Sequence, residues 1–301
     1  MKTVGQYTQG VIYVVLAYVS WGVLPLFWKH LDTIPAMDVL AHRIVWSSIL
    51  SLALCLFIRR NELRKYFSDP KSLVRLTITG ILVSVNWGVY IYAVLSGQIV
   101  EASLGYFINP LVSIVLGMIF LGEKMNKTQI AAFFLAMVGV AYLTFNYGHF
   151  PWIAIVLALT FGIYALLKKK MSYDSMSALA VETTLVAPIA LAYLLFGAST
   201  VGLSFSAQPY SVAVLLVLGG VVTALPLYWF GMAAVRISLF SIGFFQYIAP
   251  SMKLFIGIRI FHEAFTVTHA LSFSFIWAGL ALYIGDMIVK LRRQHNFNSK
   301  S

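Results

Sequence analysis

Charged side chains are scarce in this chain. Asp, Glu, Lys and Arg make up 10% of its 301 residues, whereas a soluble domain has about 25%. Hydrophobic residues make up 60%, and the mean hydropathy is +0.88. A soluble fold could not shield this much apolar surface from water with so few charged residues. The composition therefore excludes a soluble domain and predicts a chain embedded in lipid. The 15% of aromatic residues also excludes a disordered chain.

Cysteine is nearly absent, and so are the motifs of common catalytic sites. The single cysteine, Cys55, excludes an internal disulfide and a cysteine-rich metal site. His262 and Glu263 are not followed by a second histidine at the zincin spacing, and the chain has neither a G-x-S-x-G elbow nor a P-loop. We therefore expect no enzyme activity, no metal, no cofactor and no ATP-driven step within this chain.

The excess of positive charge needs an explanation, because a net charge of +11 is common in proteins that bind nucleic acid. Here the cations lie in short patches between long apolar runs, which is the pattern of membrane topology. We expect the lipid bilayer, and no nucleic acid, as a partner.

Ten apolar runs approach the length of about 20 residues that a helix needs to cross a bilayer. They predict an all-α polytopic membrane protein with ten transmembrane helices. The runs are 10–28, 37–58, 73–96, 102–121, 128–146, 151–167, 176–196, 211–231, 237–258 and 267–289.

Lysine and arginine predict the orientation of these spans. With the N-terminus in the cytoplasm, 17 of the 21 basic residues fall in cytoplasmic segments and only Lys29 and Arg259 at outer ends. This bias follows the positive-inside rule. The expected location is the plasma membrane, multi-pass, with both termini cytoplasmic, the second of them at the end of a polar tail over 290–301.

The chain also matches itself at an offset of 140 residues. The paired positions are Trp21 with Phe161, Gly22 with Gly162, Lys29 with Lys169, Ala93 with Ala233, Pro110 with Pro250, Gly117 with Gly257, Glu123 with Glu263, Thr128 with Thr268, Gly139 with Gly279 and Ala141 with Ala281. Each half, 1–146 and 147–289, then has five spans, and an odd number forces the second half to enter from the opposite side. This predicts two inverted five-helix repeats, a signature of secondary transporters.

Pro110 and Pro250 occupy matching places inside the fourth and ninth spans. A proline within a helix removes a backbone hydrogen bond, and paired prolines in two repeats predict helix breaks around a central site. A simple kink is the alternative. Asn109 and Gln246 lie beside the two positions, which favours the site.

Several of these positions carry a family resemblance. The sequence SLGYFINP at 103–110 resembles the fourth-span motif of the RarD subfamily of EamA-type permeases, within the drug/metabolite transporter superfamily. The resemblance extends to Trp21, Gly22, Pro25, Ala41, His42, Arg43, Trp46, Asn86, Trp87, Gly122, Glu123, Gln246, Tyr247, Pro250 and Glu263. It implies two inverted repeats of five helices, a cavity lined mainly by the first four helices of each half, and export of a small metabolite or drug-like molecule.

Basic side chains inside the spans are the first candidates for substrate binding, because an intramembrane charge usually faces a cavity or a partner. Arg43 cannot be neutralised in practice, and Lys253 lies at a similar outer depth. With His42 they predict an electropositive vestibule that favours anionic or zwitterionic substrates. A structural pair or hydration from the outer mouth is the alternative for Arg43.

His42 and Glu182, which match at the repeat offset, are candidates for proton coupling or for a gate. The alternatives are a hydrogen-bonded histidine and, for Glu182, an ion pair with a lysine near the cytoplasmic side.

Amides and aromatic rings complete the predicted site. Asn86 and Tyr90 share a helix face with four-residue spacing. The predicted lining residues are Asn86, Trp87, Tyr90, Tyr106, Asn109, Gln246 and Tyr247, with ordinary aromatic packing as the alternative. Glu123 and Glu263 end the fourth and ninth spans just before the expected starts of the next helices, so we expect structural acids that stabilise a helix N-terminus.

Together these features predict a secondary transporter that moves a small metabolite or amphipathic drug-like molecule by alternating access. A channel and a translocator of lipid-linked intermediates stay open as alternatives, and a membrane scaffold is a weaker one. No pattern indicates an oligomeric state.

Overall fold

The computed structural model describes residues 4–96, 98–148, 150–196, 199, 202, 209–260 and 266–298. Its regular elements are all helical, and no strand occurs in these ranges. The elements are α1 (Val4–Trp28), η1 (Lys29–Leu31), α2 (Ala36–Ile58), α3 (Arg60–Ser68), α4 (Pro70–Leu95), α5 (Ile99–Leu121), α6 (Lys127–Tyr147), α7 (Trp152–Met171), α8 (Ser175–Phe196), α9 (Tyr210–Ala234), α10 (Leu239–Gln246), α11 (Ile248–Ile260) and α12 (Val267–Asn298).

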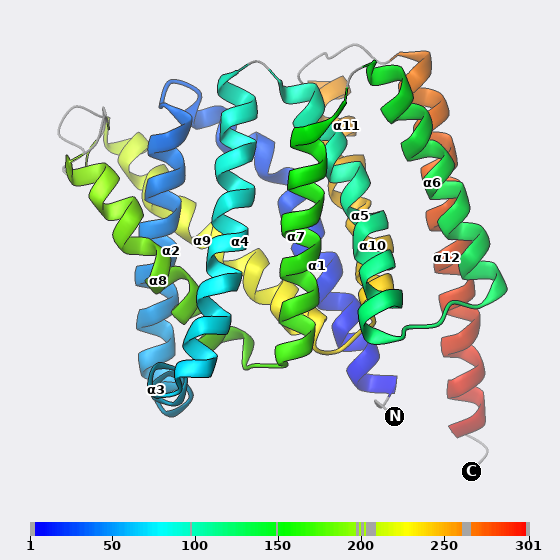
Figure 1. Ribbon diagram of the computed structural model, residues 1–301, viewed down its shortest axis with the longest axis horizontal. Helices are drawn as coiled ribbons and strands as arrows, with labels where there is room; N and C mark the ends of the chain where they lie inside the picture. Colours follow the sequence, from blue (N-terminus) through cyan, green and yellow to red (C-terminus); the bar gives the residue numbers. More distant parts are fainter. Residues whose placement is uncertain are drawn as a thin grey trace.

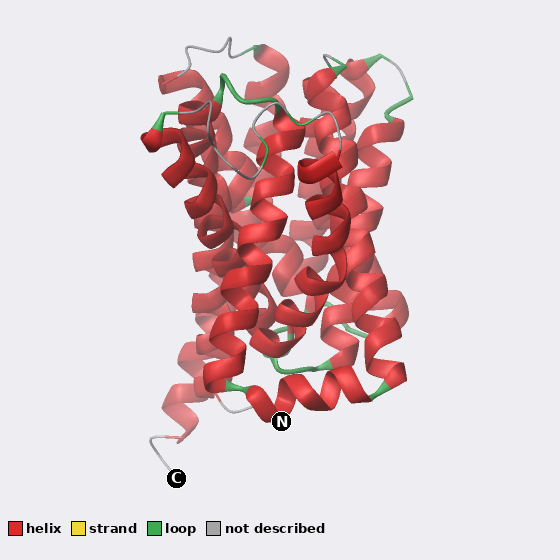
Figure 2. Ribbon diagram, turned by 90° about the vertical axis from the view of Figure 1, so that its left-hand side faces the viewer, coloured by secondary structure: helices red, strands yellow, loops and turns green. Residues whose placement is uncertain are grey.

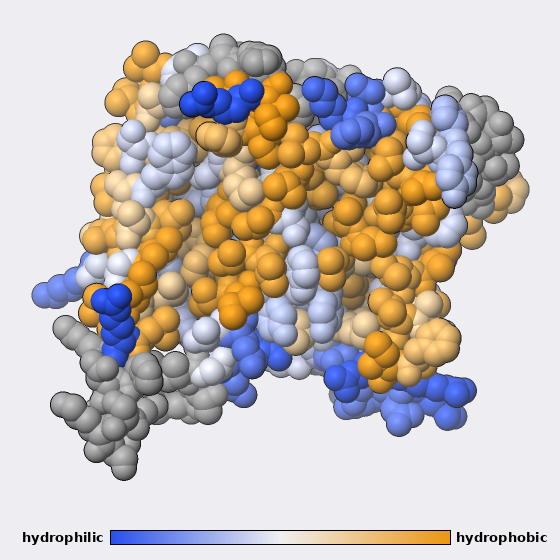
Figure 3. Space-filling model, turned by 180° about the vertical axis from the view of Figure 1, so that it is seen from behind, coloured by the Kyte–Doolittle hydropathy of each residue, from blue (hydrophilic) through white to orange (hydrophobic). Residues whose placement is uncertain are grey.

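Ten stretches of helix are long and apolar enough to span a membrane, which confirms the all-α polytopic prediction. The long helices run roughly parallel, and both ends of the chain lie at the same face of the bundle, across which α3 is laid (Figures 1 and 2). A broad hydrophobic band lies between hydrophilic rims (Figure 3). Phe57, Phe145 and Phe196 are more than 80% exposed, as expected for side chains that contact lipid tails.

The helices pack into a main bundle and a separate pair. α2 packs against α8 and α9, α1 against α9 and α11, α4 against α7, and α5 against α7 and α10. α6 and α12 pack against each other at one edge, on the right in Figure 1. The close approach of this pair depends on small residues, because a Cβ on Gly279 would lie 2.6 Å from the carbonyl oxygen of Ala132.

We expect Gly279→Leu to destabilise the α6–α12 pair by about 1–3 kcal/mol, the usual cost of overpacking. Gly285→Leu on the same helix is the matched control, because a Cβ there meets no atom within 4 Å. Thermal unfolding of the two variants in detergent measures the difference. Equal stability of both variants would contradict the close contact at Gly279.

The two prolines have different local structures. The ninth span is divided at Tyr247 into α10 and α11. Pro250 has no N–H to donate to the carbonyl of Gln246, four residues earlier, and α10 ends at Gln246. α5 continues through Pro110 as one helix, so the expected break is present in the second half and not in the first. A membrane helix tolerates a proline when neighbouring helices, side chains or water satisfy the freed backbone carbonyl. A role of either proline in transport stays a prediction.

Candidate substrate cavity

A cavity of about 510 Å³ lies inside the main bundle, within the usual range of small-molecule sites. It extends from Tyr18 and Trp21 in the middle of α1 to Leu31, Asp32 and Ile34, in and just after η1. α6 and α12 contribute none of its described lining residues. Eight of the predicted binding residues line it: Arg43, Asn86, Trp87, Tyr90, Tyr106, Asn109, Gln246 and Lys253. Pro250 lines it as well.

Arg43 reaches the cavity from α2 and is held by rings and a hydroxyl. Its guanidinium carbon lies 4.7 Å from the ring centroid of Trp28 and 5.0 Å from that of Trp87. Its Nε donates to Oγ1 of Thr223 over 2.9 Å. No carboxylate of the described residues pairs with it. Cation–π contacts therefore stabilise this charge without neutralising it.

Lys253 on α11 is held in a similar way. Its Nζ lies 4.2 Å from the ring centroid of Tyr106, and Tyr106 meets Tyr90 in an edge-to-face contact of 5.8 Å. Within the described part of the chain Lys253 makes no ion pair. The cavity thus contains two cations that come from different helices and rest against aromatic rings.

Three amides are oriented by bonds at their outer sides. Asn86 donates through Nδ2 to the carbonyl of Leu157 over 2.8 Å and to Thr160 over 2.9 Å, which leaves its Oδ1 for the cavity. The Ser113 hydroxyl lies 3.4 Å from both Oδ1 of Asn109 and Oε1 of Gln246 and shares its one proton between them. The amide groups of Asn109 and Gln246 therefore present donors to the cavity.

His42 and Tyr247 do not line the cavity. His42 follows Leu40 and Ala41 on α2 and is fully buried. Tyr247 is buried among Phe107, Val140 and Phe273, toward α6 and α12. Successive helical residues point about 100° apart, and here this step directs Gln246 into the cavity and Tyr247 away from it. The structure thus places Tyr247 in a packed core, whereas the sequence placed it among the binding residues.

An aromatic layer lies on the side of the cavity that faces the chain termini. Trp21 contacts Phe161 at 5.8 Å, Phe161 contacts Phe230 at 5.3 Å, and Phe230 stacks on Tyr164 at 5.9 Å. Phe230 and Tyr164 are fully buried. Trp21 and Phe161 line the cavity, and the buried rings of Phe230 and Tyr164 lie behind them on this side.

A buried ion pair follows beyond this layer. Lys168 Nζ lies 3.0 and 3.1 Å from the two carboxylate oxygens of Glu182, and the two side chains are 5% and 2% exposed. Thr79 donates to the same carboxylate over 2.6 Å. Glu182 therefore has the lysine partner that the sequence left as one of two alternatives. Lys168 and Thr79 were not predicted, because they lie on other helices and share no spacing with Glu182.

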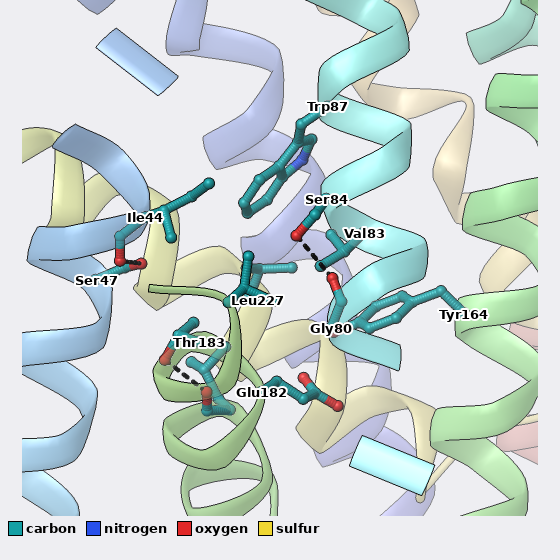
Figure 4. Close-up of a pocket in the computed structure, with 12 residues that line it drawn as sticks. Ile44, Ser47, Gly80, Val83, Ser84, Trp87, Tyr164, Glu182, Thr183 and Leu227 are labelled. Atoms are coloured by element: carbon teal, nitrogen blue, oxygen red, sulfur yellow. Dashed lines mark hydrogen bonds between the residues drawn. The ribbon is translucent and has the colours of Figure 1, made fainter. Parts of the chain in front are cut away.

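A small cavity of about 20 Å³, enough for about one water molecule, lies between Glu182 and the large cavity. Trp87 and Leu227 line both cavities. Figure 4 shows Trp87 and Glu182 at opposite ends of the small cavity, with Leu227 between them. Glu182 thus lines a small, mainly apolar cavity that is adjacent to the large one.

Glu123 stabilises a helix N-terminus, but not the one expected. Its carboxylate accepts from the backbone amides of Leu239 and Phe240 at the start of α10, over 2.7 and 2.9 Å. The start of the following helix, α6, is capped instead by a reciprocal capping box of Asn126 and Gln129. The difference arises because α5 packs against α10. The matching acid, Glu263, lies outside the described residues.

Two contributors to the cavity were missed by sequence reasoning. Trp28, at the end of α1, was not among the predicted binding residues and packs on Arg43. Thr223, 180 residues from Arg43, accepts its Nε hydrogen bond. No pattern in the sequence indicates such a contact, because it depends on the packing of α2 against α9.

Known proteins with similar sequences include uncharacterized transporters and RarD proteins. The EamA-like transporter family model matches residues 8–145. The uncharacterized transporter YojE of Bacillus subtilis is 44% identical over 91% of this chain and 93% of its own. Protein RarD of Streptomyces exfoliatus is 40% identical over 97% of this chain and 93% of its own. Protein RarD of Escherichia coli is 37% identical over 96% of this chain and 98% of its own.

A solved crystal structure has the same fold. It matches with a TM-score of 0.71 at 18% sequence identity, over 92% of this chain and 97% of the solved chain. At that identity the likeness shows the fold alone. The relatives above, at 37–44% identity over nearly their full lengths, agree with the family resemblance inferred from the sequence. This chain is a member of the RarD subfamily of EamA-like transporters.

Proposed function

We propose that this membrane transporter is a secondary carrier that moves a small amphipathic molecule across the plasma membrane by alternating access. The observation that carries the proposal is a substrate-sized cavity at membrane depth that is bounded differently at its two ends. Toward η1 its lining ends at Asp32, an exposed residue. Toward the chain termini an aromatic layer and the Lys168–Glu182 pair follow.

Element boundaries support two repeats, 1–146 and 147–289. α4 and α9 begin 140 residues apart, at Pro70 and Tyr210, and α6 and α12 do so at Lys127 and Val267. At the same offset α1 corresponds to α7, α4 to α9, and α5 to α10 and α11. Equivalent helices make equivalent contacts across the two halves: α1 packs on α9 and α7 on α4, and α1 packs on α11 and α7 on α5. Such equivalence is expected of inverted repeats, whose two mirror-related arrangements provide the inward-open and outward-open states.

The positive-inside rule supports an outward-open state. α3 and the basic end of α7, with Lys168, Lys169 and Lys170, lie at the same face as the chain termini. If this face is cytoplasmic, the mouth near Asp32 is external and the aromatic layer closes the inner side. To reach the inward-open state, the carrier must separate the ring contacts and the Lys168–Glu182 pair, which makes that pair the proposed inner gate.

Topology reporters test this orientation. Fusions after Arg60, Lys127, Lys169 and Arg293 should report the cytoplasm, and fusions near Asp32, Gly148 and Ser204 should report the outside, because the charge bias and the ten spans require it. Activity of a cytoplasmic and a periplasmic reporter is measured at each site. A cytoplasmic signal at Ser204 would contradict the inverted second half.

Counterflow in proteoliposomes tests the carrier mechanism. Unlabelled substrate inside the vesicles should accelerate uptake of labelled substrate several-fold over empty vesicles, because only an alternating site is stimulated from the opposite side. The substrate is first sought by comparing metabolites inside and outside cells with and without the protein, which also tests export. Uptake that does not saturate and is not stimulated would indicate a channel instead.

A further inference from the structure

The chain stabilises its intramembrane cations in two different ways. Lys168, below the aromatic layer, is paired with the carboxylate of Glu182 at 3.0 Å. Arg43 and Lys253, which line the cavity, rest on the rings of Trp28, Trp87 and Tyr106. A carboxylate cancels a charge, whereas a ring attracts it and leaves its field in place. The cations in the cavity thus keep a positive field that a bound anion would meet.

The two cations face the cavity from different walls. Arg43 comes from α2 and lies against α1, α4 and α9, while Lys253 comes from α11 and lies against α5. Figure 1 shows α2 and α11 on different sides of α1, α4 and α7. A ligand between the walls can therefore meet both charges at separate points.

The free donors of these groups define how an anion would bind. Thr223 occupies Nε of Arg43, and neither Nη group hydrogen-bonds to a described residue, so the guanidinium edge can hold a carboxylate with two bonds. The amide nitrogens of Asn109 and Gln246 donate to no described residue, while the two amide oxygens share the single proton of the Ser113 hydroxyl. Asp32, exposed at the mouth, is the one acidic residue among the described lining residues.

We propose that the cavity binds an organic anion with two separated acceptor groups, a carboxylate on the Nη edge of Arg43 and a second anionic or polar acceptor at Lys253. The inference rests on the proposed carrier function and names its substrate class. A neutral or cationic molecule of the same size would leave both charges without a counterion in the membrane interior, where an uncompensated charge is costly. The aromatic rings and apolar lining residues then contact the carbon skeleton of the anion.

Binding to the purified protein in detergent tests this class directly. The probes are phenylsuccinate, a dianion, its neutral diamide, and phenethylammonium, a cation. Thermal stabilisation over a concentration series should give a dissociation constant for phenylsuccinate about 10- to 100-fold lower than that for the diamide, the range for hydrogen bonds to charged groups. Small-molecule cell extract, separated into anionic, neutral and cationic fractions, is tested in the same way, and the anionic fraction should stabilise most.

Variants connect the effect to the two cations. Arg43→Gln and Lys253→Met should each weaken phenylsuccinate binding about tenfold or more. Lys170→Met is the matched control, because Lys170 also lies over a ring, that of Phe120 at 6.0 Å, but does not line the cavity. It should bind as the unmodified protein does. If Arg43→Gln fails to fold, the preference for probes and the Lys253→Met variant still test the inference.

The proposal is overturned if the diamide or phenethylammonium binds as tightly as phenylsuccinate, or if stabilisation comes from a neutral or cationic fraction or from none. It is also overturned if Lys170→Met weakens binding as much as Lys253→Met. Failure of the carrier mechanism is distinct from these results. Selective anion binding without counterflow would reject the carrier mechanism and support the anion site. Counterflow of a cation would support the carrier mechanism and reject the anion site.

Discussion

Glu182→Leu is expected to destabilise the protein by about 3–5 kcal/mol, the cost of leaving a buried charge without its partner. Lys168 is 5% exposed and its ammonium group would lose both carboxylate oxygens, and Thr79 would lose its acceptor. Unfolding in a denaturing detergent titration measures the change. Glu62→Leu is the matched control, because its partner Lys65 lies at 3.9 Å on an exposed surface and such pairs contribute about 0–1 kcal/mol.

The double variant Lys168→Met with Glu182→Leu should recover most of the lost stability, because it leaves no buried charge and apolar side chains can replace such a pair. It also separates structure from gating. A folded double variant with altered transport would support the pair as an inner gate. A folded double variant with normal transport would restrict the pair to a structural role, and a single variant as stable as the unmodified protein would contradict the ion pair itself.

Arg43 carries the second large effect. Arg43→Gln should lower the ratio of maximal transport rate to apparent KM by about 10- to 100-fold, the range for a lost hydrogen bond to a charged group. Arg43→Lys should lower it less. It keeps the charge but not the planar group that Thr223 orients at 2.9 Å. Counterflow of the identified substrate measures both variants, normalised to the amount of protein in the membrane.

Thr223→Val provides the control for positioning. It removes the acceptor of Arg43 Nε and keeps the size of the side chain, so apparent affinity should fall while the charge is unchanged. If Arg43→Gln is inserted at normal abundance and transports with unchanged affinity and rate, Arg43 does not bind substrate. The amides of Asn86, Asn109 and Gln246 would then be the next candidates, because they line the same cavity.

The proposed transport between two states would account for the different composition of the two ends of the cavity. The inner side uses interlocked rings and one ion pair, which hold closely but can separate as units. The proposed external mouth uses the short η1 segment and the exposed Asp32. The division of the ninth span at Tyr247, beside the lining residue Gln246, provides a place where α10 and α11 could change their mutual angle.

By itself the sequence determined the ten spans and eight of the residues that line the cavity. This was possible because lipid imposes strict rules: about 20 apolar residues per span, and a functional reason for each buried polar group. Arg43, Asn86, Asn109 and Lys253 stand out in apolar surroundings for that reason, and all four line the cavity. The motif at 103–110 identified the family independently of any structure.

Only the tertiary structure decided which groups meet. The ion pair of Lys168 with Glu182, the packing of Trp28 on Arg43, and the binding of Glu123 to the start of α10 all join different helices. Such contacts depend on how helices rotate and pack, which an apolar pattern does not encode, because lipid-facing and core-facing positions are both hydrophobic here. For the same reason Tyr247 seemed equivalent to Gln246 in the sequence, although a rotation of about 100° directs it into a packed core.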